Sequence, residues 1–110
     1  MNIIKLLGRV EHTASESSND RIVQKLVDDE VKTILAITLK NGAILSKHKA
    51  SEPITVLCFS GKGEFRAGDG MSESESLEPG TLIAVDANIE HEVRALPNTQ
   101  IIVTKFKNSD

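Results

Sequence analysis

Two stretches of the sequence decide the fold, Gly42-Ala-Ile-Leu-Ser-Lys-His48 and Gly80-Thr-Leu-Ile-Ala-Val-Asp-Ala-Asn-Ile-Glu-His91. Each begins at a glycine typical of a turn, continues through an apolar run and ends at a histidine. His48 lies six residues after its glycine, and His91 lies eleven residues after its own. If the two stretches face each other in the fold, they bring both imidazoles to one cavity.

Short predicted strands surround these stretches on both sides. Alternating apolar residues and β-branched side chains predict strands over residues 21–27, 31–40, 54–60, 64–67, 71–77, 81–85, 91–96 and 100–106. Turn signals separate them, among them Asn41-Gly42, Gly61-Lys62-Gly63 and Pro97-Asn98. Residues 31–40 are apolar on both sides, which predicts burial on both faces, and residues 71–77 are polar enough for an exposed edge strand. No segment favours a helix, so we expect an all-β sandwich or barrel.

Composition narrows the classes of function. The chain has 110 residues, enough for one domain, and its net charge of −3 gives no electrostatic footprint for nucleic acid or an anionic membrane. The aromatic residues are three Phe, which argues against stacking of nucleic-acid bases. The single cysteine, Cys58, and the lack of Trp disfavour an immunoglobulin-like sandwich, the main all-β alternative. One cysteine and no long apolar run lead us to expect a cytoplasmic protein.

The two opening stretches resemble the paired motifs of the cupin family. The first fits a Gly, five residues and a His, and the second fits a Gly, five residues, a Pro-x-Gly turn, two residues and a His, with Asp86 and Asn88 at the Pro and Gly positions. The resemblance covers residues 30–106 and is closest to short single-domain, RmlC-like cupins. It implies a double-stranded β-helix, or jelly roll, that pairs as a homodimer. We expect an N-terminal arm at residues 1–20 and the barrel at residues 21–110, with residues 31–39 contributing to the dimer.

The sequence departs from the family at the metal ligands. Metal-binding cupins supply His-x-His and a Glu from the first motif and a His from the second, but here Ala50 and Ile54 hold the second His and Glu positions. Only His48 and His91 remain, so we predict an incomplete site that holds a divalent transition metal (Zn, Ni, Fe or Mn) weakly, if at all. Cys58 could complete a His/His/Cys site for zinc or copper. Alternatively, each histidine is structural and bonds to a carbonyl or water.

Alternation along the strands predicts which side chains line the barrel interior. The candidate ligand-binding residues are His48, Ala50, Ile54, Val56, Cys58, His91 and Val93. Ile83, Val85 and Ala95 are expected to point inward as well. Such a cavity is mostly aliphatic with two titratable groups, which suits a small molecule held by few polar contacts.

Three functions follow from this site. The first is a small-molecule-binding or sensing module without a complete metal site. The second is a metal-dependent cupin enzyme, of the dioxygenase or isomerase type, with His48 and His91 as ligands. The third is a metal-free enzyme with His91 as general base. The residues at positions 50 and 54 count against the second function, because neither Ala nor Ile can bind a metal.

Overall fold

The computed structural model describes residues 16–17 and 20–107, with the side chains of residues 16–17 and 47–49 outside the description. Its strands are β1 (Glu16–Ser17), β2 (Arg21–Asp28), β3 (Lys32–Leu39), β4 (Ile44–Lys49), β5 (Ile54–Ala67), β6 (Glu73–Leu77), β7 (Leu82–Val85) and β8 (Glu90–Phe106). A short 3-10 turn, η1 (Asp69–Met71), precedes β6. The predicted all-β class is confirmed. No helix in the described residues has the length and apolar character that a membrane crossing needs.

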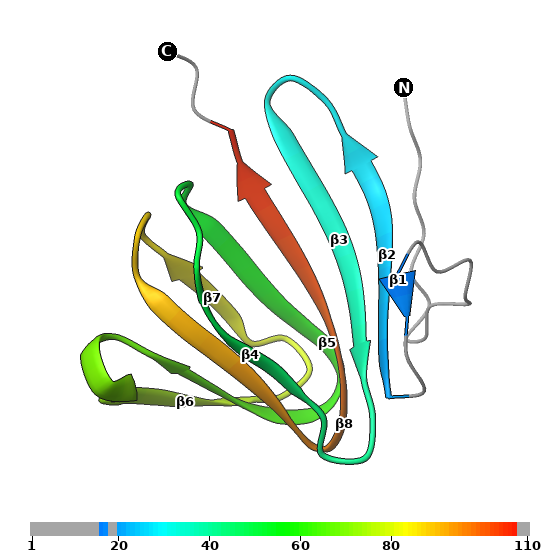
Figure 1. Cartoon of the computed structure of the whole chain (residues 1–110). Coiled ribbons are helices and arrows are strands. Elements are labelled where there is room, and N and C mark those ends of the chain that lie inside the picture. Colours follow the sequence, from blue (N-terminus) through cyan, green and yellow to red (C-terminus); the bar gives the residue numbers. More distant parts are fainter. Residues whose placement is uncertain (1–15, 18–19, 108–110) are drawn as a thin grey trace.

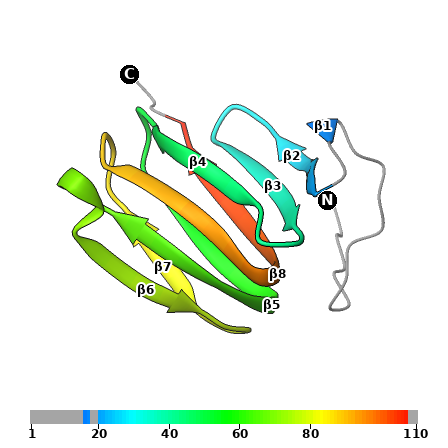
Figure 2. The same ribbon diagram turned by 60° about the horizontal axis from the view of Figure 1, so that its bottom comes forward.

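Two long strands, β5 and β8, bend and take part in two facing sheets (Figure 1). The first sheet contains β1, β2, β3, the C-terminal half of β8, the N-terminal half of β5, and β7. The second contains β4, the N-terminal half of β8, the C-terminal half of β5, and β6, which lie side by side in Figure 2. All of these pairings are antiparallel. The arrangement is the jelly roll that the sequence predicted.

The predicted turn at Gly61-Lys62-Gly63 is wrong, because β5 runs through it as one strand of 14 residues. The register between β5 and β8 shifts twice here, on either side of Gly61. A Cβ atom on Gly61 would overlap the carbonyl oxygen of Asn98, and one on Gly63 would lie 2.7 Å from that of Arg94. The two glycines therefore allow a bulged bend at which the backbones of β5 and β8 pass closely. Glycine is typical of such bends as well as of turns.

The predicted break at Pro97-Asn98 is wrong for the same reason. β8 is continuous over 17 residues and bends opposite β5, where its partners change from Gly63↔Ala95 to Gly61↔Thr99. Turn-forming residues mark the bend in the sequence, but the strand pairs on both sides of it. The two predicted strands at each of these places are halves of one strand that serves both sheets.

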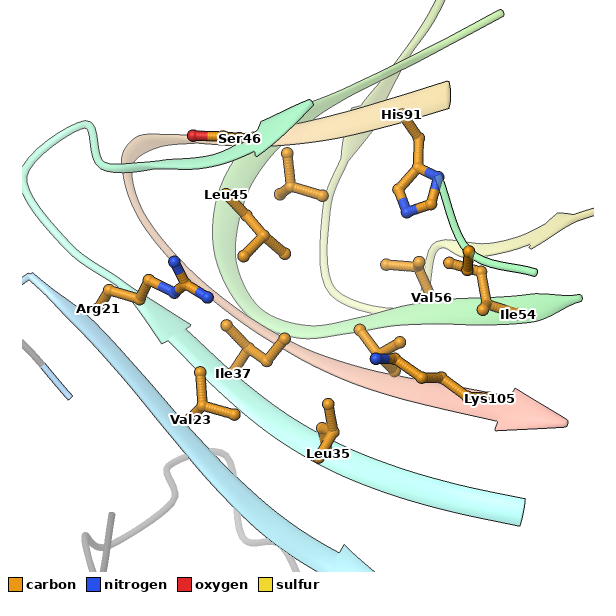
Figure 3. Close-up of a pocket in the computed structure, with 13 residues that line it drawn as sticks. Arg21, Val23, Leu35, Ile37, Leu45, Ser46, Ile54, Val56, His91 and Lys105 are labelled. Carbon is orange, nitrogen blue, oxygen red and sulfur yellow. The ribbon is translucent and has the colours of Figure 1, made fainter. Parts of the chain in front are cut away.

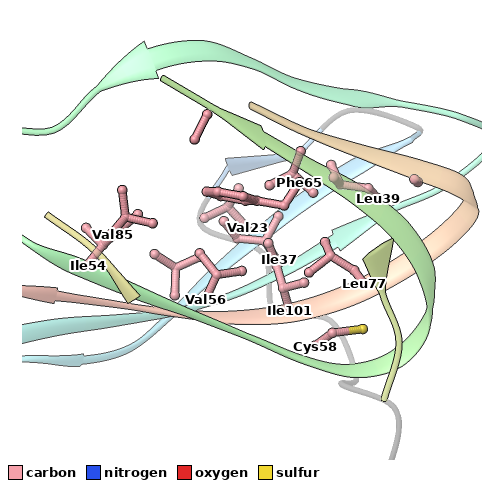
Figure 4. Packing of buried hydrophobic residues seen from close by; sticks show 14 residues of the cluster. Val23, Ile37, Leu39, Ile54, Val56, Cys58, Phe65, Leu77, Val85 and Ile101 are labelled. Atoms are coloured by element: carbon pink, nitrogen blue, oxygen red, sulfur yellow. The ribbon is translucent and has the colours of Figure 1, made fainter. Parts of the chain in front are cut away.

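The core fills the space between the two sheets (Figure 4). Its members are Val23, Ile37, Leu39, Ile54, Val56, Cys58, Phe65, Ala67, Leu77, Val85, Val93, Ala95, Ile101 and Val103. The burial expected on both faces of residues 31–40 holds in the second half of β3, where Ala36, Ile37, Thr38 and Leu39 are all buried. The first half of β3 is only half-buried.

One edge strand of the sheets was predicted from the sequence, and another was not. β6 is an exposed edge strand as predicted, pairing with β5 through one side and burying only Leu77. Two residues of the expected N-terminal arm form β1, which pairs with Ile22 and Val23 of β2. The rest of that arm lies outside the described residues. β2 itself pairs with β3 of the same chain.

Candidate functional site

The interior of the barrel holds a cavity of about 400 Å³ (Figure 3). Its lining comes from β2, β3, β4, β5 and β8, and from the segment after β4. The lining residues are Arg21, Val23, Leu35, Ile37, Leu45, Ser46, Ala50, Ile54, Val56, His91, Val93, Val103 and Lys105. We call this space the basic cavity. Its size and its mostly apolar wall are those of a small-molecule site.

His91 is the predicted site residue that the structure fixes most firmly. It lies at the start of β8, is 2% exposed, and points into the basic cavity (Figure 3). Its Nδ1 is 2.9 Å from the carbonyl oxygen of Ile89. Because a carbonyl oxygen only accepts hydrogen bonds, Nδ1 carries a proton. The ring also stacks on Phe65 with centroids 5.9 Å apart and planes 17° apart, so its orientation is set from two sides.

The backbone brings the second histidine next to the first. His48 on β4 is the register partner of His91 on β8, so the two predicted motifs do meet. The side chain of His48 lies outside the described residues. The motif spacing therefore predicted the adjacency of the two positions in the fold.

Alternation predicted five lining residues, which are Ala50, Ile54, Val56, His91 and Val93. The structure places the sixth described candidate, Cys58, elsewhere. Its side chain is fully buried, and its Sγ lies 3.5 Å from the Thr99 hydroxyl and 3.6 Å from the Ser60 carbonyl oxygen, beside the bend of β5. Cys58 shares a face with Ile54 and Val56 but lies outside the cavity lining.

Two cationic side chains of the cavity were not among the predicted site residues. Arg21 opens β2 and Lys105 lies near the end of β8, and both point into the cavity (Figure 3). Each is half-buried. The signal was present, because Lys105 continues the inward series of Ile101 and Val103, and Arg21 precedes the inward Val23 by two positions.

The described donors do not fit a resident transition metal. Within the described side chains, no three His, Cys, Asp or Glu residues lie together as a metal-binding group. Ala50 and Ile54 occupy cavity positions without donor atoms, and Cys58 lies away from the lining. Stable sites take three or more protein ligands. Among the described side chains, the polar groups that line the cavity are His91, Arg21, Lys105 and the Ser46 hydroxyl.

A second hollow of about 330 Å³ lies across the ring pair from the first. It is lined by Phe65, Ala67, Glu73, Ser74, Glu75, Ile83, Ala84, Val85, Asp86 and Ile89, and we call it the acidic groove. His91 lines the basic cavity, whereas Phe65 and Ile89, its stacking and hydrogen-bonding partners, line the acidic groove. The predicted inward residues Ile83 and Val85 belong to this second space.

Two carboxylates in the loop between β2 and β3 have lowered pKa values. The Lys32 amine and the backbone N–H groups of Val31 and Lys32 lower the pKa of Asp29 to about 2. A hydrogen bond from Lys107 is the main cause that lowers the pKa of Asp28. These are exposed, paired surface charges, and neither lines a cavity.

The similarity of this chain to known proteins lies mainly in its fold. No family model matches the sequence. The L-ectoine synthase of Vibrio campbellii is 33% identical over 66 residues, which cover 60% of this chain and 50% of that protein, so the match spans about half of that relative.

The fold is similar to that of many solved structures, two of which cover most of this chain. A cupin superfamily protein from Desulfitobacterium hafniense superposes with a TM-score of 0.76 at 13% identity, covering 86% of this chain and 84% of that one. An RmlC-like cupin with a double-stranded β-helix from Methanocaldococcus jannaschii gives 0.72 at 20% identity, covering 96% and 93%. At such identities the likeness establishes the fold. The chain therefore has the cupin fold, a double-stranded β-helix.

Proposed function

We propose that this protein binds a small organic molecule in the basic cavity, without a resident metal. The observation that carries the proposal is the cavity itself. It has a volume of about 400 Å³, and its mostly aliphatic wall carries a few converging polar groups. Ligand sites in proteins have this size and this mixture of apolar wall and sparse polar contacts. The ring of His91, held by Phe65 and by the Ile89 carbonyl, supplies a preorganised polar contact.

The choice of a binding module over a metal-dependent enzyme rests on the donor set. Ala50 and Ile54 stand where metal-binding relatives of the predicted family would carry His and Glu, and both line the cavity. The match to L-ectoine synthase covers half of that protein and leaves its activity outside this proposal. A binding or sensing role needs only a shaped cavity and fixed polar contacts, which the described residues supply.

The proposal can be tested by filling the cavity. Ala50 is half-buried in the lining, and Ala50→Phe would place a ring inside the basic cavity. Ala84→Phe is the matched control, because Ala84 is exposed and lines the acidic groove. In a thermal-shift screen of small metabolites, ligands should raise the melting temperature of the wild type and of Ala84→Phe but not of Ala50→Phe. Ligands that stabilise all three proteins equally would contradict the proposal.

We also propose that the protein forms a homodimer through the first sheet. Leu57 on β5 and Leu82 on β7 are register partners and are 36% and 64% exposed, which gives that sheet an apolar outer patch. Burial of such a patch between two copies is a common use of exposed apolar surface. Light scattering at micromolar concentration should give a dimer that Leu82→Lys dissociates. A wild-type monomer would contradict the proposal.

A further inference from the structure

The charges around the basic cavity are one-sided. Its lining contains the cations Arg21 and Lys105, and no Asp or Glu is among the described residues that line it. Both lining charges are basic although the chain as a whole carries more acidic than basic residues, 16 against 13. Lys105 makes no ion pair with any described residue. Its neighbours in the lining include the apolar side chains of Leu35, Ile54 and Val103. A cation in such surroundings favours an anionic partner.

The strand register keeps the two cations apart. Arg21 is the partner of Leu39 on β3, and Lys105 is the partner of Thr33 on the same strand. These positions are six residues apart, which corresponds to about 20 Å along an antiparallel strand. In Figure 3 both side chains extend from these positions toward the middle of the cavity, so a ligand spans less than the separation of the backbone positions. Figure 3 shows Arg21 and Lys105 reaching into the cavity from separate places in its wall.

Apolar side chains cover the surface between the two cations. Leu35 and Ile37 of β3 and Val103 of β8 line the cavity between the register positions of Arg21 and Lys105. A ligand that satisfies this surface has an acid group at each end and a hydrocarbon middle. Charge-assisted hydrogen bonds at the ends would fix its position, and burial of its middle would add apolar stabilisation.

On the basis of the proposed function, we infer that the ligand of the basic cavity is a small organic dianion, a dicarboxylate with an apolar middle. One carboxylate is received at Arg21 and the other at Lys105. The distance between the cations selects the length of the ligand. His91 and Ser46 are the other polar residues among the described ones that line the cavity.

Isothermal titration calorimetry with simple acids tests the inference directly. The ligands are dicarboxylates of rising length, from succinate and glutarate through adipate to pimelate and suberate. Hexanoate and hexanediol have the same chain length as adipate but carry one negative charge and no charge, respectively. We expect dicarboxylate affinity to pass through a maximum along the series. At that maximum the dianion should bind about tenfold tighter than its monocarboxylate, the usual magnitude for one hydrogen bond to a charged group.

Variants assign the two ends. Lys105→Met and Arg21→Met should each reduce the affinity for the best dicarboxylate about tenfold, to that of the matched monocarboxylate. Lys105→Arg should retain the dicarboxylate preference. Lys62→Met is the matched control, because Lys62 is exposed and outside the cavity, and it should bind as the wild type does. Thermal melting of each variant verifies that it is folded.

The outcomes separate this inference from the proposed function. Equal affinities for adipate and hexanoate, unchanged binding in both Met variants, or no binding of any dicarboxylate would overturn the dianion. Binding of hexanediol as tightly as adipate would also overturn it, yet would support a small-molecule site. The proposed function itself fails only in the cavity-filling screen, if ligands stabilise Ala50→Phe as well as the wild type.

Discussion

The basic cavity and the acidic groove lie on opposite sides of the stacked rings of His91 and Phe65 and differ in the sign of their charges. The cavity carries Arg21 and Lys105, whereas the groove carries Glu73, Glu75 and Asp86. The difference follows from the strands that supply them. β2 and the end of β8 give the cations, and β6 with the residue after β7 gives the acids.

The two charge sets also differ in their access to water. Glu73, Glu75 and Asp86 are exposed, so water and salt screen their fields. Arg21 and Lys105 are half-buried beside apolar side chains, where a charge acts more strongly on a ligand. The comparison teaches that one barrel can carry a groove with exposed acids and a cavity with half-buried cations.

Removing the ring that divides the two spaces has the largest expected effect. Phe65→Ala should lower the free energy of unfolding by about 3–5 kcal/mol, because Phe65 is 4% exposed and its loss leaves a void. Urea unfolding measures the loss. Phe106→Ala is the control, since that ring is 41% exposed, and it should cost less than about 1 kcal/mol. Equal losses in the two variants would show that Phe65 does not support the division.

The bend of β5 brings its backbone close to that of β8, and its glycine, Gly61, should be the next most sensitive position. Gly61→Ala should cost about 2–4 kcal/mol, from a left-handed backbone and the overlap with the Asn98 carbonyl. Gly42 has a similar φ of +73° but open space around it, so Gly42→Ala should cost only about 1 kcal/mol. The difference between the two, measured by thermal and urea unfolding, isolates the close approach. A Gly61 loss no larger than that of Gly42 would contradict this account of the bend.

The sequence predicted the fold well because the paired glycine and histidine motifs lie on strands that pair in the structure. It predicted which face of a strand a side chain occupies better than where along the barrel that side chain lies. Alternation put Ile54, Val56 and Cys58 on one face correctly, but only tertiary structure shows that Cys58 lies outside the cavity lining. Arg21 and Lys105 were missed because charged residues near strand ends resemble solvent-facing ones. The turn predictions at residues 61–63 and 97–98 failed because glycine and proline mark bends within strands as well as turns.

Paired surface charges give a third, smaller effect. The pKa of Asp29 is lowered from 3.8 to about 2, chiefly by its hydrogen bond with Lys32. A lowered folded pKa stabilises the fold above the unfolded value and loses that contribution as the pH falls toward the folded value. Asp29→Asn should therefore be slightly less stable than the wild type near neutral pH, and the gap should close by about pH 2. Urea unfolding across this range measures it, and a gap independent of pH would contradict the assignment.

Metal content should show the smallest effect. Because no three His, Cys, Asp or Glu residues in the described part of the chain are grouped so that they could hold a metal ion, protein purified without an affinity tag should contain metal well below one equivalent. Elemental analysis of the wild type and of His91→Ala measures this. One equivalent of iron, manganese, nickel or zinc that is lost in His91→Ala would instead support the metal-dependent alternative.

The most direct test of the central claim compares the two spaces in one experiment. Methyl groups of Val56, Leu35 and Val103 report on the basic cavity, and those of Ile83 and Val85 report on the acidic groove. In a methyl NMR titration with a dicarboxylate, we expect saturable shifts confined to the first group and suppressed by Lys105→Met. Shifts centred on Ile83 and Val85 would contradict the claim that the basic cavity is the ligand site. So would shifts that appear equally in both groups of methyls and are the same in the wild type and in Lys105→Met.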